Sequence, residues 1–138
     1  MKTKTVFITD HDATRLSDFI EAADDSSFCE MELIRSLRTR LDKAKIIKQK
    51  NAPQYLVTMN SYLRITDLGA KTDMNFWLSF PRDALKDKEK VSVISDIGVA
   101  IIGSKVGDVV ESVNSETKRQ FRIAQIYYQP EHNEHYNL

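Results

Sequence analysis

The strongest constraint on the fold of this chain is an apolar segment, punctuated by glycines, around residue 100. Valine alternates with other residues over Val91–Ser95, and this period of two predicts a strand. The small apolar residues of Gly98–Ile102 do not suit an exposed loop, so they predict a short buried helix that ends at Gly103. Gly107–Asp108 then predicts a turn into a second strand, Val109–Val113.

Other segments of alternating apolar and polar residues extend this unit to an antiparallel sheet of about five strands around one short helix, an α+β arrangement. We expect the additional strands at Val57–Ile65, Met74–Phe80 and Phe121–Tyr127, with a turn at Asp67–Gly69. The alternation places Trp77 on the opposite face from Phe76. This favours a contact surface for Trp77, with the core as the alternative.

The N-terminal part has the periodicity of helices. Thr5–Thr9 predicts a short strand, and Asp10 is a typical N-cap for a helix that follows it. Ser27 and Glu30 have the spacing of a capping box at the start of a second helix. Each helix has an apolar stripe with steps of three and four residues: Ala13, Leu16, Ile20 and Ala23, then Ile34, Leu37, Leu41 and Ala44. The pattern predicts an antiparallel helical hairpin, packed as a short coiled coil.

Charge divides the two arms of this hairpin. Acidic residues dominate positions 10–32, and basic residues dominate positions 35–50. One interpretation is that the charged faces are solvated, attract each other and match the helix dipoles. The other is that the hairpin is a probe whose acidic tip consists of Asp24, Asp25 and Glu30.

A domain boundary is expected at Lys50–Pro53, where a charged, helix-breaking segment precedes the change from helical to strand periodicity. The sequence thus predicts a strand and helical hairpin over residues 1–50 and a sheet domain over residues 51–138. We expect few contacts between the two parts and cleavage by proteases near Gln49–Gln54.

Composition limits the cellular setting. The chain has 20 acidic and 20 basic residues among 138, so net charge gives no argument for direct nucleic-acid binding. No apolar run reaches membrane-spanning length, no signal-peptide pattern is present, and the single Cys29 has no partner for an internal disulfide. These features predict a cytoplasmic protein.

Catalytic and metal-binding patterns are poor. His11 lies at a helix start, and His132 and His135 lie in a polar tail that we expect to be mobile. Cys29 has no neighbouring histidine and is expected to be an inert thiol. No glycine-rich phosphate loop is present. We therefore expect no enzyme activity, no metal site and no cofactor.

The central segment also resembles a known family. Ser95–Gly103, with the sequence S-D-I-G-V-A-I-I-G, and Val106–Asp108 are similar to the C-terminal signature of the bacterial GreA/GreB transcription elongation factors, roughly S-P-x-G/A-x-A-L-L-G-x-x-V-G-D. Asp96 stands where that family usually has proline. Val57–Ser61 and Tyr128–Glu131 are similar to the Rnk branch, the regulators of nucleoside diphosphate kinase.

The resemblance implies an FKBP-like fold for residues 51–138 and RNA polymerase as the partner. In Gre factors the loop that matches Ser95, Asp96, Ile97 and Gly98 meets the rim of the polymerase β′ subunit near the secondary channel. Ile97 is then a partly exposed apolar anchor beside Asp96, or it is a buried residue that caps the core. DNA would be near only through the polymerase. We expect a monomer without membrane contact.

In Gre factors a long coiled-coil hairpin carries two acidic residues into the secondary channel, where they help to hold a catalytic magnesium ion. Each arm here spans roughly 14 to 20 residues, or about 20 to 30 Å. The hairpin looks too short, and its tip lacks the Gre acidic motif. The sequence therefore predicts no transcript cleavage.

Three functions remain open at this point. The first is a polymerase-binding regulator that competes with Gre factors. The second is regulation of nucleoside diphosphate kinase, through its expression or by direct contact. The third and most remote is an FKBP-like prolyl isomerase, which has only the fold-level analogy in its favour.

Overall fold

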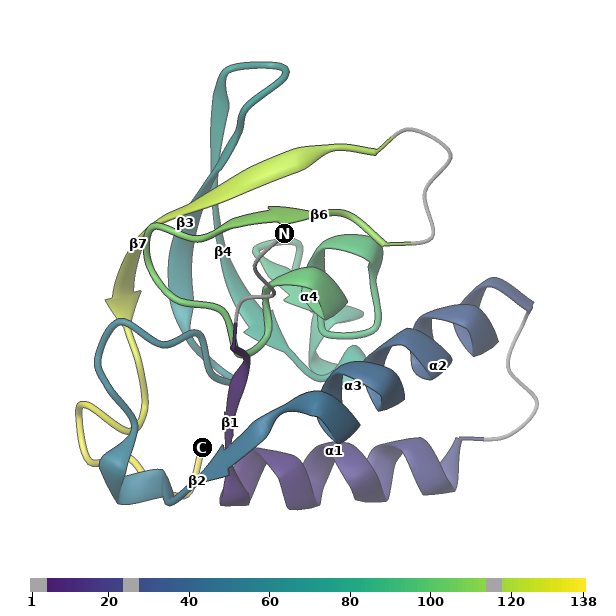
Figure 1. The fold of residues 1–138 in the computed structure, drawn as a ribbon, viewed down its shortest axis with the longest axis vertical. Helices are drawn as coiled ribbons and strands as arrows, with labels where there is room; N and C mark the ends of the chain where they lie inside the picture. Colours follow the sequence, from purple (N-terminus) through teal and green to yellow (C-terminus); the bar gives the residue numbers. More distant parts are fainter. Residues whose placement is uncertain (1–4, 24–27, 114–117) are drawn as a thin grey trace.

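A computed structural model describes residues 5–23, 28–113 and 118–138. Two helices lie along one side of a curled sheet, and a short helix lies between the sheet and the second of them (Figure 1). The elements are β1 (Phe7–Thr9), α1 (Asp10–Ala22), α2 (Phe28–Lys43), β2 (Lys45–Ile47), the 3-10 helix η1 (Gln49–Asn51), β3 (Tyr62–Asp67), β4 (Thr72–Ser79), α3 (Pro81–Ala84), β5 (Lys90–Ser92), α4 (Asp96–Ile101), β6 (Val109–Glu111) and β7 (Gln120–Tyr128). The fold is α+β, as the sequence predicts.

The main sheet has five strands in the order β5-β4-β3-β7-β6. β3 pairs antiparallel with β4 and β7, and β6 pairs antiparallel with β7. β5 runs parallel to β4, so the prediction of a wholly antiparallel sheet is wrong at this edge. The physical reason is the connection through α3, which carries the chain back as far as Trp77, so that β5 runs beside the last three residues of β4 in the same direction.

β3 begins later than the sequence predicts. The residues before it form a turn, because Asn60 adopts a left-handed conformation with φ of 66°. The turn that follows β3 is the expected one. Asp67 Oδ1 accepts hydrogen bonds from the backbone N–H groups of Gly69 and Ala70, each at 3.0 Å, and so fixes the hairpin between β3 and β4.

Helix α4 is fixed at both ends by close backbone approaches. The Ser95 hydroxyl accepts a hydrogen bond from the Gly98 N–H at 2.9 Å and donates one to the Ser92 carbonyl at 2.7 Å. Gly98 has no room for a side chain, because a Cβ there would lie 2.1 Å from the Ser92 carbonyl oxygen. Gly103 follows the helix with φ of 82°, and its carbonyl accepts a hydrogen bond from the Phe7 N–H of β1.

α1 and α2 run side by side in opposite directions (Figure 1). Thr9 rather than Asp10 caps α1, since its hydroxyl accepts a hydrogen bond from the Asp12 N–H at 3.1 Å. The predicted cap was therefore one residue too far along the chain. After α2 the chain forms β2, which the sequence does not predict and which pairs parallel with β1. The predicted capping residue Ser27 lies outside the described residues.

The hydrophobic core is continuous across the predicted domain boundary. It joins Leu16 and Ile20 of α1 and Leu37 of α2 to residues of the sheet and of α4, such as Leu63 and Ile101. The expectation of few contacts between residues 1–50 and 51–138 is therefore wrong. The apolar stripe of each helix faces the sheet domain as well as the other helix, because a two-helix hairpin is too small to bury both stripes by itself. Cleavage at Gln49–Gln54 stays a prediction.

The close approach at Gly98 predicts a strict glycine requirement. We expect Gly98→Ala to lower the free energy of unfolding by about 3 kcal/mol, because the added methyl group meets backbone atoms of Ser92 and Val93 that cannot move independently of β5. Urea denaturation measures this as a lower midpoint with an unchanged slope.

Gly69→Ala is the matched control. The nearest atom to a Cβ at Gly69 is Asp67 Oδ1 at 3.5 Å, an ordinary contact distance. This variant should stay within about 0.5 kcal/mol of the parent. Equal effects of the two alanines would contradict the packing argument.

Candidate functional site

The segment Ser95–Gly98, in which the sequence predicts a docking site, forms the N-terminal end of α4. Its backbone is held on both sides, because Ser95 caps the helix and the Asp96 carbonyl accepts a hydrogen bond from the Val113 N–H at 3.2 Å. The Asp96 side chain is half-buried and accepts a hydrogen bond from the Ile97 N–H at 3.0 Å. Aspartate in the first turn suits the helix dipole, and proline suits the first helical position equally, so the departure from the family pattern leaves the start of α4 intact.

Ile97 belongs to the core. Its side chain is 9% exposed and packs in the main hydrophobic cluster. The expectation that Ile97 is a partly exposed anchor is therefore wrong, and the alternative, a residue that caps the core, is confirmed. Ile97 is the second residue of α4, and this position turns it toward the interior while Asp96 lies at the surface.

The other end of α4 is bound by an arginine from the hairpin. Arg40 of α2 donates from Nε to the Ile102 carbonyl at 2.7 Å and from a terminal nitrogen to the Ser104 hydroxyl at 2.8 Å. Burial lowers the pKa of Arg40 to about 10, partly offset by the charge of Asp108, so it stays protonated at neutral pH. A cation at a helix C-terminus satisfies carbonyls that have no partner within the helix. The sequence assigned Arg40 only to a charged helix face.

The hairpin tip is only partly described. Asp24 and Asp25 lie outside the described residues, and Glu30 is exposed in the first turn of α2. No group of three or more His, Cys, Asp or Glu residues that could hold a metal ion occurs among the described residues. The structure thus brings neither the tip acids nor the histidines together into a metal centre in the part of the chain it describes.

Two acids, Asp12 and Glu131, are buried, although one interpretation of the sequence gives the hairpin acids, Asp12 among them, a solvated face. Asp12 is 1% exposed, pairs with Arg15 at 2.7 Å and accepts a hydrogen bond from the Met59 N–H at 3.0 Å. The Arg15 guanidinium also lies over the Phe80 ring, 5.2 Å from its centre. Burial raises the pKa of Asp12 against the opposing effects of Met59 and Arg15.

The second acid, Glu131, lies in the C-terminal tail. It is 5% exposed; its Oε1 accepts a hydrogen bond from the Thr58 hydroxyl at 2.7 Å, whereas its buried Oε2 has no hydrogen-bond partner among the described residues. Burial raises the pKa of Glu131, and the nearby charge of Asp12 raises it further. The expectation of a mobile tail is wrong here, because Gln129 donates hydrogen bonds to the carbonyls of Pro53 and Leu56, both at 2.7 Å.

The outer face of the sheet carries a row of aromatic residues. Trp77 of β4 lies against Tyr62 of β3, with ring centres 4.8 Å apart, while Phe76 points into the core. Tyr128 of β7 lies opposite Tyr62 in the strand register, and the centre of its ring is 5.6 Å from that of the Trp77 ring. Trp77 is half-buried on this face, opposite Phe76 as the alternation predicts, and its use as a contact surface stays a prediction.

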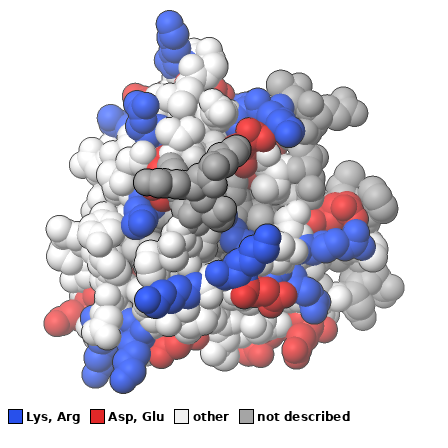
Figure 2. Space-filling view, in the orientation of Figure 1, with Lys and Arg blue, Asp and Glu red and all other residues white. Residues whose placement is uncertain are grey.

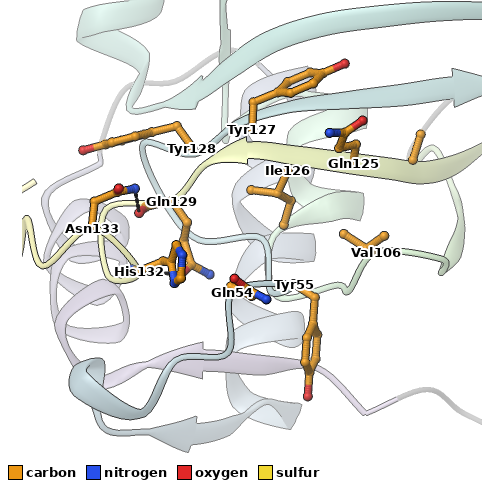
Figure 3. A pocket seen from close by; sticks show the side chains of 11 residues that line it. Gln54, Tyr55, Val106, Gln125, Ile126, Tyr127, Tyr128, Gln129, His132 and Asn133 are labelled. Atoms are coloured by element: carbon orange, nitrogen blue, oxygen red, sulfur yellow. Dashed lines mark hydrogen bonds between the residues drawn. The ribbon is translucent and has the colours of Figure 1, made fainter.

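A groove of about 440 Å³ runs along the end of β7 (Figure 3). Ile126 points toward Val106 and Tyr55, whereas Gln125 and Tyr127 point to the opposite side of the strand. Asn133 donates a hydrogen bond to the Gln129 carbonyl at 2.9 Å and holds the far end of the groove. No local pattern in the sequence predicts this groove, because its walls come from three separate segments.

Charge on the hairpin is mixed. Figure 2 shows acidic and basic side chains next to one another on the visible face of α1 and α2. Two described ion pairs of the hairpin, Arg15–Asp12 and Arg35–Glu32, each lie within one helix. The charge split along the sequence thus does not produce a surface of a single sign on this face.

Comparison with known families decides the relationship. The model of the family "Transcription elongation factor, GreA/GreB, C-term" matches residues 52–128, more than half of the chain. The chain belongs to the GreA/GreB family. The match includes α4 and the segment Ser95–Gly98, so the predicted resemblance is confirmed.

Individual relatives are similar to this protein over most of its length. The regulator of nucleoside diphosphate kinase of Escherichia coli (strain K12) is 25% identical, over 95% of both chains. GreA of Clostridium botulinum (strain Eklund 17B / Type B) is 27% identical, over 83% of this chain and 71% of its own length. A solved GreA/GreB elongation factor from Nitrosomonas europaea shares the fold, with a TM-score of 0.71, 24% identity and coverage of 91% of this chain and 100% of its own.

Among the described residues, no helix is both long and apolar enough to span a membrane.

The buried acid Glu131 predicts a dependence of stability on pH. Its folded-state pKa lies above the usual 4.5, so its stabilising contribution is complete below that value and is lost as the pH rises through the folded-state pKa. Glu131→Gln removes this loss and keeps an oxygen for Thr58. We expect the stability of Glu131→Gln relative to the parent to increase from about pH 4 to about pH 7 in urea denaturation.

Glu134→Gln provides the control, since Glu134 is exposed and lies three residues further along the same tail. Its stability relative to the parent should change little over the same pH range. A pH-independent difference for Glu131→Gln would show that the burial of Glu131 does not control its titration.

Proposed function

We propose that this protein is an RNA polymerase-binding transcription regulator of the Gre/Rnk type, which docks near the secondary channel, competes with Gre factors and does not stimulate transcript cleavage. The observation that carries the proposal is the family match over residues 52–128, which includes the rigid segment at the start of α4. The relative from Escherichia coli, which matches in length as well as sequence, supports the Rnk-type part.

The docking surface is proposed to centre on Asp96. Ile97 is buried, so the segment offers a carboxylate at the surface rather than an apolar anchor. Helix capping by Ser95 and the bond from Val113 hold this carboxylate in a fixed position. A fixed carboxylate suits basic residues on the rim of the polymerase β′ subunit, the site that the Gre resemblance implies.

We expect Asp96→Lys to weaken binding to core RNA polymerase by at least about tenfold, or about 1.4 kcal/mol, through charge reversal at the contact. The melting temperature should remain close to that of the parent, because the described hydrogen bond of the Asp96 side chain is to the adjacent Ile97 N–H and ties it to no other element. Binding is measured by co-elution and by titration, with and without a Gre factor as competitor.

Asp83→Lys is the matched control. Asp83 is an aspartate in the first turn of α3, as Asp96 is in the first turn of α4, but Asp83 is exposed and Asp96 is half-buried. Normal binding by Asp83→Lys together with weak binding by Asp96→Lys supports the docking segment. Normal binding by both variants would place the polymerase contact elsewhere, and absence of binding by the parent would remove the proposed function.

The proposed absence of cleavage activity follows from the hairpin. α1 and α2 contain 13 and 16 residues, or about 20 and 24 Å of helix. Much of this length packs on the body of the protein, as the buried Leu16, Ile20 and Leu37 indicate. A hairpin held in this way supports a position at the entrance of the channel and not a probe that reaches its end.

We therefore expect no stimulation of transcript cleavage in a backtracked polymerase complex at saturating protein, with a Gre factor as the positive control. RNA products are resolved on a gel. Cleavage that disappears in the Asp24→Ala/Asp25→Ala variant would contradict this expectation and would restore a magnesium-holding role for the tip.

A second candidate function is direct contact with nucleoside diphosphate kinase. The name of the Escherichia coli relative favours it. Pull-downs with purified core polymerase and with purified kinase separate the two functions, because each requires a different partner to be retained.

A further inference from the structure

The groove along β7 lies at an open strand edge. β6 pairs with β7 only over Gln120–Arg122, and the backbone of Ile123 then bonds to Gly107 and Asp108. Over residues 124–127 no described hydrogen bond outside the β3 ladder involves the β7 backbone. Four residues of strand, about 13 Å, therefore present one edge without a strand partner among the described elements.

Two bulges shape this edge. Relative to β3, the strand β7 has two extra residues. Ala124 is extra because Ile65 pairs with Ile123 while Arg64 pairs with Gln125. Tyr127 is extra because Leu63 pairs with Ile126 while Tyr62 pairs with Tyr128. Bulges turn strands and occur often beside binding sites. Here they bend β7 away from β6 and leave space between the strand and the opposite wall.

The walls of the groove carry no charged side chain. None of its eleven lining residues is Asp, Glu, Lys or Arg, although such residues form 29% of the chain, and five of the eleven are Gln, Asn or His. Three of the five tyrosines of the protein, Tyr55, Tyr127 and Tyr128, contribute to the groove, although the Tyr127 ring points to the outer side of β7. Depletion of charge and enrichment of tyrosine distinguish the centres of protein interfaces from other surfaces.

Side chains on the two faces of β7 differ. Ile126, Val106 and Tyr55 line the inner side of the groove, and Tyr55 and Val106 are 51% and 39% exposed. Gln125 and Tyr127 project to the outer side. A strand added to β7 would therefore place alternate side chains against an apolar wall and against an outer surface of Gln125 and Tyr127, where the Arg64 guanidinium lies 5.7 Å from the centre of the Tyr127 ring.

We propose that the open edge of β7 binds an extended, uncharged peptide segment of a partner protein by strand addition. Its main chain hydrogen-bonds to the β7 backbone at residues 124–127, and an apolar side chain lies against Ile126, Val106 and Tyr55. A second copy of the chain is the competing occupant, which a concentration-dependent dimer would reveal. The surface shares no residue with Ser95–Gly98 and goes beyond the proposed polymerase docking.

The test begins with selection of a random library of linear nonapeptides on the full-length protein, with Val106→Asp as the counter-selecting variant. One enriched peptide is synthesised in three forms: unmodified, and N-methylated at alternate residues in each of the two registers, one of which removes the donors that face the strand edge. Binding is followed by NMR shifts of the backbone amides.

We expect enriched peptides with an uncharged centre and alternate apolar residues, and the largest shifts of backbone amide signals at residues 124–128. We also expect binding to be at least about tenfold weaker for Val106→Asp and for one of the two N-methylation registers. Ile46→Asp, at a β-branched residue of β2 that is 49% exposed, should bind as the parent does.

Four outcomes would overturn the proposal: no enriched peptide, equal binding of the unmodified and both methylated forms, shifts centred outside residues 124–128, or a concentration-dependent dimer that Val106→Asp abolishes. The last outcome would assign the edge to a second copy. None of them bears on the Asp96→Lys result, so failure of strand addition and failure of polymerase docking are distinguishable.

Discussion

The packing of α4 determines how the rest of the molecule is arranged. Its first turn meets the backbone of Ser92 so closely that only glycine fits at position 98, and the glycine after its last turn meets the backbone of β1. Arg40 then joins the same end of α4 to the hairpin. Through these three contacts one short helix fixes the main sheet, the β1–β2 pair and α2 relative to one another.

This arrangement explains why the hairpin lies along the body of the protein. Arg40 binds α2 at one point, and Asp12 binds α1 at another through the Met59 backbone. Both bonds are buried or partly buried, and breaking either would leave a charge without its partners. The hairpin is consequently part of the domain, and its orientation is set by buried polar bonds as well as by its apolar stripes.

The surfaces available for partners follow from this architecture. The start of α4 presents a fixed carboxylate, whereas the end of β7 presents an uncharged edge. They differ in chemistry because one is a helix terminus, where a charge matches the dipole, and the other is a strand edge that has no strand partner among the described elements.

Several features of this protein are determined by the sequence alone, because they depend on local order along the chain. The strand, buried helix and glycine turn around residue 100 are the clearest case, together with the two helical stripes and the opposite faces of Phe76 and Trp77. Local spacing also carries the resemblance to the GreA/GreB family, since a helix cap and two close-packed glycines require particular residues at particular positions.

Only the tertiary structure decided the rest. Burial of Asp12 and Glu131, the inward position of Ile97, the role of Arg40 and the groove at β7 each depend on segments that are far apart in the sequence. An acid on a helix has the same local pattern whether water or another part of the chain covers it. Its environment is set by long-range packing, which a periodic pattern does not encode.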